Sequence, residues 1–271
     1  MVLLRILLLS SFLALPMASF ALELRGSLQQ GGLVLGTVEK GSRAYYLDEP
    51  LQLTDQGQFL LGLGRDAPDT IEIRMVDEDQ MQTIHKFTVI QRDYRIQRVN
   101  GVPAKTVTPN ESDLARIRND VVLVKRARRD ITNAIDFLDG FERPLEGPIT
   151  GVYGSQRVYN GVPKNPHFGV DYAAPTGTEV KAPAAGIVRL AHPDLFYSGG
   201  TLIIDHGHGL SSSFLHLSDI LVAEGSRVMH GQPIAKVGAT GRATGPHLDW
   251  RMNWRQQRID PQLVLETLPR Q

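Results

Sequence analysis

His167-Phe-Gly-Val-Asp171 and Gly245-Pro-His-Leu-Asp249 stand near the two ends of the stretch that decides the fold, residues 165–254. Both motifs lie in segments typical of β-strands, in which every second side chain points to the same face. His167 and Asp171 can therefore share one face, and so can His247 and Asp249. Two such strands side by side would direct four imidazole and carboxylate groups to one point. That ligand set suits a zinc ion that keeps one position open for water.

The surrounding region, residues 145–265, is predicted to be an all-β domain. Glycine and proline become dense from Leu145 onward, and helical periodicity is almost absent. Strands are expected at residues 181–190, 200–205, 211–217 and 233–238. Four apolar residues alternate on the face opposite His247 and are expected in the core: Leu248, Trp250, Met252 and Trp254.

Residues 22–100 form a second predicted unit, a β-rich accessory domain. Strands are expected at residues 33–38, 44–47, 59–61, 71–76 and 86–90, with glycine- and proline-containing turns between them. This spacing indicates a small antiparallel sandwich. His85 is its one histidine, and no cluster of catalytic residue types occurs there. We expect a spacer or recognition module.

Residues 101–144 are predicted to be a linker that contains an amphipathic helix. Ser112 is a candidate N-cap, Asp113 suits the first turn, and Gly140 and Pro144 are expected to end the helix. Apolar residues follow a spacing of three or four: Leu114, Ile117, Val121, Val124, Ile131, Ile135 and Leu138. The pattern fits either a coiled-coil seam or a single helix that packs on its own chain.

Composition excludes several classes of protein. A length of 271 residues favours two domains, and a formal charge of +0 with 21% charged residues argues against a nucleic-acid binder. The 42% of hydrophobic residues is enough for substantial cores. The chain contains no cysteine, which excludes thiolate zinc ligands and cysteine nucleophiles and is compatible with export.

The first 21 residues have the pattern of a signal peptide. Arg5 precedes a short apolar run, then Pro16, and Ser19 and Ala21 supply the small residues before a cleavage point. We expect cleavage after Ala21 and a periplasmic protein without a membrane span in its mature part, with an uncleaved anchor as the alternative.

Three motifs and two scaffold segments, in order across about residues 147–261, resemble the M23 (LytM/lysostaphin-type) zinc metallopeptidases. The motifs are Asn165-Pro-His-Phe-Gly-Val-Asp171, Phe214-Leu-His-Leu-Ser218 and Thr244-Gly-Pro-His-Leu-Asp249. The scaffold segments are Ala182-Pro-Ala-Ala-Gly186 and Val228-Met-His-Gly-Gln-Pro-Ile-Ala-Lys-Val-Gly238. Three ordered motifs are far more specific than any one of them.

The resemblance implies roles for individual residues. His167 and Asp171 would bind Zn²⁺, position 249 would supply the third ligand, and His216 and His247 would be catalytic. The two catalytic histidines would polarise the zinc-bound water and stabilise the tetrahedral oxyanion. The implied reaction is hydrolysis of peptide bonds in peptidoglycan stem peptides or cross-links. Peptidoglycan is the implied partner, with other cell-wall enzymes as further candidates.

Asp249 departs from the family pattern, which usually has histidine there. An aspartate oxygen and an imidazole Nδ1 both lie two bonds beyond Cβ, so Asp249 fits if the family histidine binds through Nδ1. It falls short if that histidine binds through Nε2. Two carboxylates would also neutralise Zn²⁺ and weaken it as a Lewis acid, which predicts a slower enzyme or a more alkaline optimum.

Two further hypotheses remain open from the sequence. Arg251 shares the strand face of Asp249, so an ion pair between them could replace metal binding. The chain would then be a degenerate LytM-domain protein that activates a peptidoglycan amidase. Arg157 and Tyr159 precede the first ligand motif, where a loop that contacts substrate is expected.

Overall fold

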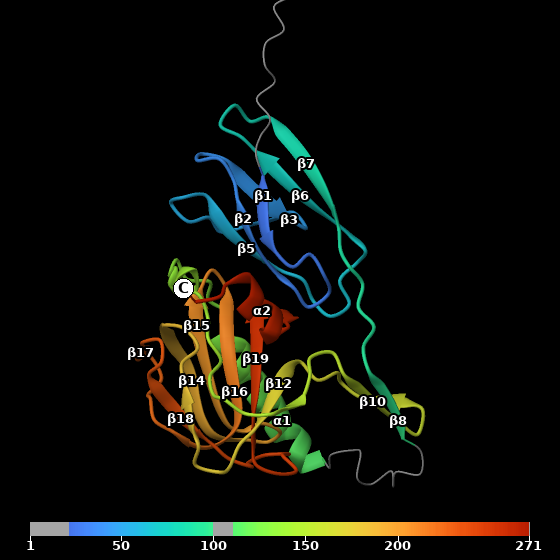
Figure 1. The fold of residues 1–271 in the computed structure, drawn as a ribbon, viewed down its shortest axis with the longest axis vertical. Helices are drawn as coiled ribbons and strands as arrows, with labels where there is room; N and C mark the ends of the chain where they lie inside the picture. The colour runs from blue at the N-terminus through green and yellow to red at the C-terminus, as the bar shows by residue number, and fades with distance from the viewer. Residues whose placement is uncertain (1–21, 100–110, 271) are drawn as a thin grey trace, which may run out of the picture.

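The computed structural model describes residues 22–99 and 111–270 (Figure 1). The predicted signal peptide and the start of the linker, residues 100–110, lie outside the described residues. Two β-rich parts are stacked end to end, the accessory part above and the motif-bearing part below in this view. Among the helices of the described ranges, none has the length and apolarity needed to cross a membrane.

The accessory part consists of two small antiparallel sheets, which confirms the predicted sandwich-like fold. One sheet has the order β1 (Glu23–Gly26), β2 (Leu33–Thr37), β5 (Gln58–Gly62). The other has the order β4 (Glu49–Pro50), β3 (Arg43–Tyr46), β6 (Thr70–Val76), β7 (Gln82–Thr88). In β6, Ile71, Ile73 and Met75 are buried whereas Thr70 and Glu72 are exposed, so alternation decides the buried face.

The motif-bearing part is built on one large sheet, which confirms the prediction of a mainly β fold. Its main path has the order β17 (Arg227–Val228), β14 (Gly186–Leu195), β15 (Gly199–Gly207), β16 (Leu210–Ile220), β19 (His247–Trp254), β12 (Gly169–Ala173), β9 (Ile149–Gly151). Beside this path lie β13 (Glu179–Lys181), β18 (Pro233–Val237) and β20 (Gln257–Ile259). The strand expected at residues 181–190 is two strands, because Pro183 has no N–H to donate to a ladder.

The two faces of β19 differ as alternation predicts. The apolar face is buried, with Leu248, Trp250 and Met252 fully shielded and Trp254 4% exposed. The opposite face carries His247, Asp249, Arg251 and Asn253. That face, called here the site face, is where the candidate centre lies.

The linker helix α1 (Glu111–Ala127) is shorter than predicted. The expectation of one helix as far as Leu138 is wrong, and only a short 3₁₀ turn, η2 (Asp136–Asp139), follows. Tertiary contacts hold the chain extended after Ala127. Thr132 accepts a hydrogen bond from the His208 N–H through its carbonyl at 3.0 Å and donates its hydroxyl to Asp205 at 2.9 Å.

The apolar side of α1 packs on its own chain. Leu123, Val124 and Ala127 contact a small core formed by Leu190, Leu195 and Ile203 of β14 and β15. The structure therefore agrees with a docked helix for this part of the linker.

Two elements join the upper and lower parts. Helix α2 (Pro261–Thr267), which the sequence analysis did not foresee, begins at the N-cap Asp260 and lies between them (Figure 1). Asp260 also forms an ion pair of 2.9 Å with Arg92 of the accessory part. Strand β8 (Ile96–Val99), at the end of the accessory part, pairs in parallel with β10 (Gln156–Tyr159) of the lower part. β11 (Val162–Pro163) completes this small sheet.

Candidate metal centre

Strands β12 and β19 place two carboxylates directly opposite each other. Asp171 pairs with Asp249 in the antiparallel register. Like charges in that position repel, so the arrangement requires nearby positive charge. The register itself follows from the apolar faces of both strands, because a shift of either strand by one residue would send its own carboxylate into the core.

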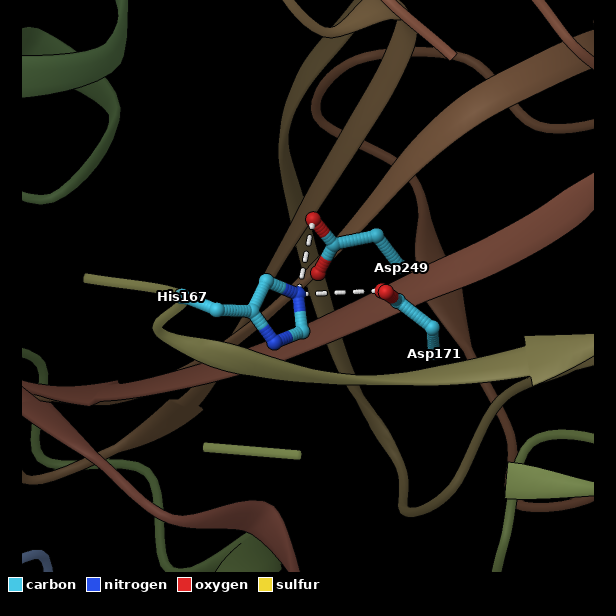
Figure 2. Close-up of side chains that lie close together, drawn as sticks. All are labelled: His167, Asp171 and Asp249. Carbon is cyan, nitrogen blue, oxygen red and sulfur yellow. Dashed lines mark ion pairs between the residues drawn. The ribbon is translucent and has the colours of Figure 1, made fainter. Parts of the chain in front are cut away.

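His167 meets these carboxylates from the segment just before β12 (Figure 2). Its Nε2 lies 3.0 Å from Asp171 Oδ1 and 3.6 Å from Asp249 Oδ2. Its Nδ1 lies 3.2 Å from the carbonyl oxygen of Val152. A carbonyl only accepts hydrogen bonds, so Nδ1 carries the hydrogen and Nε2 is the nitrogen presented to a metal.

The three residues fit a metal ion. One ligand atom from each of His167, Asp171 and Asp249 lies within 4.8 Å of the others. Among the described residues, His167 Nε2 and Asp171 Oδ1 are shielded from water and find no hydrogen-bond partner of good geometry, although they lie 3.0 Å apart as an ion pair. Shielded polar atoms without partners are rare, and lone pairs that converge on a cation explain these two. One nitrogen and two oxygens are suitable zinc ligands.

Charge in the metal-free centre is dominated by the carboxylates. Burial lowers the pKa of His167, but Asp171 and Asp249 outweigh burial and raise this pKa to about 10. The imidazole therefore holds a proton when no metal is bound, and a metal has to displace that proton.

Asp249 also pairs with Arg251, as the sequence suggested. Arg251 Nε donates to both carboxylate oxygens at 3.0 Å, and its Nη2 donates to Oδ2. Burial raises the pKa of Asp249, which is 2% exposed, but Arg251 and His167 hold this pKa below its ordinary range. The ion pair and the approach to His167 coexist, so the pairing does not turn Asp249 away from the centre.

His216 reaches the centre through an irregularity in β16. Leu215 lies opposite Asp249, so simple alternation would send His216 to the apolar face with Phe214. A register shift adds one residue to β16 here, and His216 adopts a left-handed φ of 65°. Such bulges re-aim side chains. The His216 ring consequently lies 4.8 Å from the ring of His247.

His216 and His247 lie side by side, and each uses Nδ1 for a hydrogen bond to a backbone carbonyl. Nδ1 of His216 faces the Thr240 carbonyl at 2.9 Å, and Nδ1 of His247 faces the Gly245 carbonyl at 2.8 Å. Both Nδ1 atoms are therefore donors, which leaves each Nε2 to accept or deliver a proton. His247 Nε2 lies 4.0 Å from Asp171 Oδ1. Burial lowers the pKa of His216, so this imidazole is neutral at neutral pH.

Two glycines make room for the carboxylates, and the sequence analysis missed both. A Cβ on Gly151 would lie 2.1 Å from Asp171 Oδ2, and one on Gly169 would lie 2.4 Å from Asp249 Oδ1. Gly169 is visible inside the first motif, but the neighbour of each glycine depends on strand pairing, which no local pattern reveals.

The predicted substrate residues lie outside this cluster. Arg157 is exposed and Tyr159 is half-buried on β10, with Arg157 Nη1 3.4 Å from the Tyr159 hydroxyl. The hairpin that carries them lies beside the centre, because Ser155, just before β10, accepts a hydrogen bond of 2.8 Å from the His167 N–H through its carbonyl. The structure thus brings together His167, Asp171, His216, His247 and Asp249, and leaves Arg157 and Tyr159 on the adjacent hairpin.

The motif-bearing part of the chain is similar to known peptidases. Residues 165–261 match the model of Peptidase family M23. The peptidoglycan DD-endopeptidase ShyB of Vibrio cholerae is 39% identical over 139 residues, which are 51% of this chain and 28% of ShyB. The DD-carboxypeptidase/endopeptidase Mpg of Neisseria meningitidis is 40% identical over 103 residues, 38% of this chain and 24% of Mpg. The matches therefore span about a quarter of the length of these curated relatives.

A solved structure resembles more of the chain. The crystal structure described as a peptidase M23 from Pseudomonas aeruginosa superposes with a TM-score of 0.69 at 29% identity. The match covers 89% of this chain and 96% of that one. The resemblance therefore includes the accessory part as well as the motif-bearing part.

Proposed function

We propose that this chain is a zinc-dependent endopeptidase that hydrolyses peptide bonds in bacterial peptidoglycan, because its residues 165–261 match the model of Peptidase family M23. The observation that carries the proposal is the convergence of His167, Asp171 and Asp249, with two shielded ligand atoms that lack hydrogen-bond partners. The five residues predicted to bind the metal or to be catalytic lie inside the matched region, whereas Arg157 and Tyr159 precede it.

The proposed roles follow from the free atoms of each side chain. His167 Nε2 and one oxygen each of Asp171 and Asp249 would hold the ion. Zinc, when bound, supplies the Lewis acid that makes water nucleophilic near neutral pH. The rings of His216 and His247 lie 4.8 Å apart and each engages the backbone through Nδ1, so their Nε2 atoms could accept a proton from water and later deliver one to the leaving amine. As imidazolium or N–H donors they can also stabilise a developing oxyanion.

Arg251 changes the charge argument made from the sequence. Two carboxylates cancel the two positive charges of Zn²⁺, but the guanidinium on Asp249 restores one positive charge. A centre with one carboxylate and two imidazoles has the same net charge. We therefore expect a smaller alkaline shift than two carboxylates alone would produce.

The relatives support the substrate class and the place of action. ShyB is named a peptidoglycan DD-endopeptidase, and Mpg is named a DD-carboxypeptidase/endopeptidase. We propose that this chain also acts on peptidoglycan stem peptides or cross-links, after export to the periplasm by the predicted signal peptide. Arg157 and Tyr159 are proposed substrate contacts on the hairpin beside His167.

Zinc stoichiometry of the purified mature chain is the first test. We expect close to one zinc per chain, loss of this zinc in Asp249→Ala, and no loss in Asp219→Ala. Asp219 is a suitable control because it is an exposed aspartate of β16 with only a distant lysine partner. A wild-type chain that stays free of zinc when zinc is supplied would refute the proposed centre.

Hydrolysis is tested separately with purified peptidoglycan. We expect new amino termini and soluble peptide fragments from the wild-type chain. His216→Ala should retain zinc but lose hydrolysis, because His216 lies beside the ligands without being one of them. Retention of full hydrolysis by this variant would remove His216 from the mechanism.

The ion pair between Asp249 and Arg251 favours one alternative, the degenerate protein that activates an amidase. That alternative predicts no zinc, no hydrolysis, and stimulation of a peptidoglycan amidase by the wild-type chain. Stimulation that persists in Asp249→Ala would support it.

A further inference from the structure

The site face continues beyond the metal cluster in rows set by the strand register. Asp171, Asp249 and Leu215 form the row at the cluster. Arg251 and Ser213 lie opposite each other in the next row, and Asn253 pairs with Arg258 of β20 in the row after that. Rows two residues apart are separated by roughly 7 Å along the strand.

Arg128 enters this surface from the end of α1. Its Nη2 donates to the Ser213 hydroxyl at 2.7 Å, in the row of Arg251. Its Nε is shielded from water and has no hydrogen-bond partner. Ser213 is a neutral hydroxyl, so the charge of Arg128 is not balanced by this contact.

Arg258 is the second cation of this surface. Its Nη1 lies 3.4 Å from the side-chain oxygen of Asn253, and its guanidinium lies 5.8 Å from the centre of the Phe168 ring. Phe168 follows the ligand His167 directly, so Arg258 borders the metal cluster. Both contacts are with neutral groups.

Neither arginine forms an ion pair with a carboxylate among the residues that the structure describes. Arg251 is not available to bind a further anion, because it already forms an ion pair with Asp249. Burial and the charges of Arg258 and Arg251 lower the pKa of Arg128 to about 9, and burial with the charge of Arg251 lowers that of Arg258 to about 10. Partly buried cations without a counter-ion are costly, and they are expected where an anionic ligand completes the site.

We propose that Arg128 and Arg258 form a subsite for a carboxylate of the peptide substrate, one or two strand rows from the metal cluster. The inference rests on the proposed function, because it names the chemistry of a substrate bound at that centre. One or two rows correspond to about two to four residues of an extended peptide, at about 3.3 Å per residue. The preferred substrate would therefore carry a free carboxylate within a few residues of the bond to be cleaved.

Arginine is suited to this task because its planar guanidinium binds carboxylates through two parallel hydrogen bonds. Arg128 and Arg258 are both only partly buried, so part of each side chain is reachable from solvent. A neutral amide in place of the carboxylate would leave the guanidinium groups uncompensated.

Calorimetric titration tests the subsite without turnover. The full-length His216→Ala chain is titrated with acetyl-alanyl-alanine, in its L,L and D,D forms, and with the corresponding C-terminal amides. We expect one configuration of the free acid to bind about tenfold more tightly than its amide, the factor expected for hydrogen bonds to a charged group. Arg128→Gln and Arg258→Gln should each reduce that preference severalfold.

Arg255→Gln is the matched control. Within residues 22–99 and 111–270, Arg255 also forms no ion pair with a carboxylate, but it donates to the Pro50 carbonyl at 2.8 Å, in the accessory part. This variant should keep the full preference for the acid. Equal binding of acid and amide, no binding of either, or a preference unchanged in Arg128→Gln and Arg258→Gln would overturn the subsite.

These results are separable from the proposed hydrolysis. A chain that cleaves peptidoglycan without distinguishing acid from amide would refute only the subsite. A chain that binds the acid through the two arginines but cleaves nothing would refute only the proposed activity.

Discussion

At the scale of single residues, the absence of a side chain matters as much as its presence. Gly151 and Gly169 border the two carboxylates proposed as ligands so closely that a methyl group at either position would overlap an oxygen. The carboxylate oxygens can therefore occupy their positions only while both neighbours remain glycine.

Gly151→Ala tests this steric requirement. The added Cβ displaces Asp171, so we expect zinc affinity to fall by roughly 10–100-fold, the loss typical of a disturbed ligand environment. Gly245→Ala is the control, because a Cβ there meets nothing within 4 Å. Competition with a chelator of known affinity measures both. An unchanged affinity in Gly151→Ala would show that Asp171 has room to move or does not bind.

Buried histidines outside the centre make stability depend on pH. His206 is fully buried between the Ala185 carbonyl, at 2.7 Å, and the Ser212 hydroxyl, at 2.8 Å, and burial lowers its pKa. In the unfolded chain its pKa is about 6.5. Below that pH the unfolded chain binds a proton that the folded chain does not, so the free energy of unfolding decreases as pH falls.

Denaturant unfolding of the metal-free chain at pH 7.5 and pH 5.5 measures this effect. Each such histidine contributes at most about 1.4 kcal/mol per pH unit below 6.5. His206→Gln should lose less stability than the wild type over this interval. His167 acts in the opposite direction, since its pKa is raised, but it is common to both proteins and cancels in the comparison. Equal losses would mean that His206 titrates normally.

Alternation in the sequence was enough to predict that His167, Asp171, His247 and Asp249 meet. It was not enough for His216, because alternation places that side chain on the apolar face with Phe214. The resemblance to a family identified His216, and the bulge in β16 supplies the physical reason. Bulges depend on how a strand pairs with its neighbours, so one strand's sequence does not reveal them.

At the scale of elements, α1 shows where periodicity stops being informative. The 3-4 spacing continues to Leu138, but the helix ends at Ala127. Beyond it, the Arg128 side chain donates to Ser213 of β16, and the Thr132 hydroxyl donates to Asp205 of β15. Helical spacing says which residues could share a face, and tertiary partners decide whether the helix continues.

Leu123 and Val122 provide a matched pair for the docking of α1. Leu123 packs against the core of β14 and β15, whereas Val122 is 64% exposed. Leu123→Ala should lower the free energy of unfolding by about 1–2 kcal/mol, less than for a fully buried leucine. Val122→Ala should change it by less than about 0.5 kcal/mol. Urea unfolding distinguishes them, and equal effects would indicate that Val122 is covered in solution, for example by a second helix.

At the scale of the whole molecule, the accessory part reaches the metal centre through a short series of contacts. Arg65 Nε donates to the Gly154 carbonyl at 3.1 Å, and the Gly154 N–H donates to the His167 carbonyl at 2.7 Å. Tyr94 packs against Gly154 so closely that a Cβ there would lie 2.0 Å from its ring. The same loop offers the Val152 carbonyl to His167 Nδ1. The accessory part therefore supports the loop that orients a proposed ligand.

Arg65→Gln removes this support without touching the ligands. We expect zinc affinity to fall roughly three- to tenfold, less than for a residue in direct contact with a ligand. Arg255→Gln cuts a different contact between the same two parts and should leave zinc affinity unchanged. A similar change in both variants would indicate a general loosening of the interface rather than positioning of His167.

The sequence predicted the two β-rich parts but not how they fit together. Arg65, Arg92 and Tyr94 show no motif, and their roles arise only when Gly154 and Asp260 are brought to them from more than fifty residues away. Strand β8 likewise pairs with β10 across the expected domain boundary. Such contacts depend on the assembled fold, which local patterns do not encode.

The pairing of Asp249 with Arg251 restricts how this chain can evolve. Exchange of Asp249 for histidine alone would leave a guanidinium facing an imidazole, and exchange of Arg251 alone would leave a shielded carboxylate without its cation. Either intermediate should be disfavoured by selection. In descendants of this gene, aspartate at this position and arginine two residues later should be inherited together, and lost together.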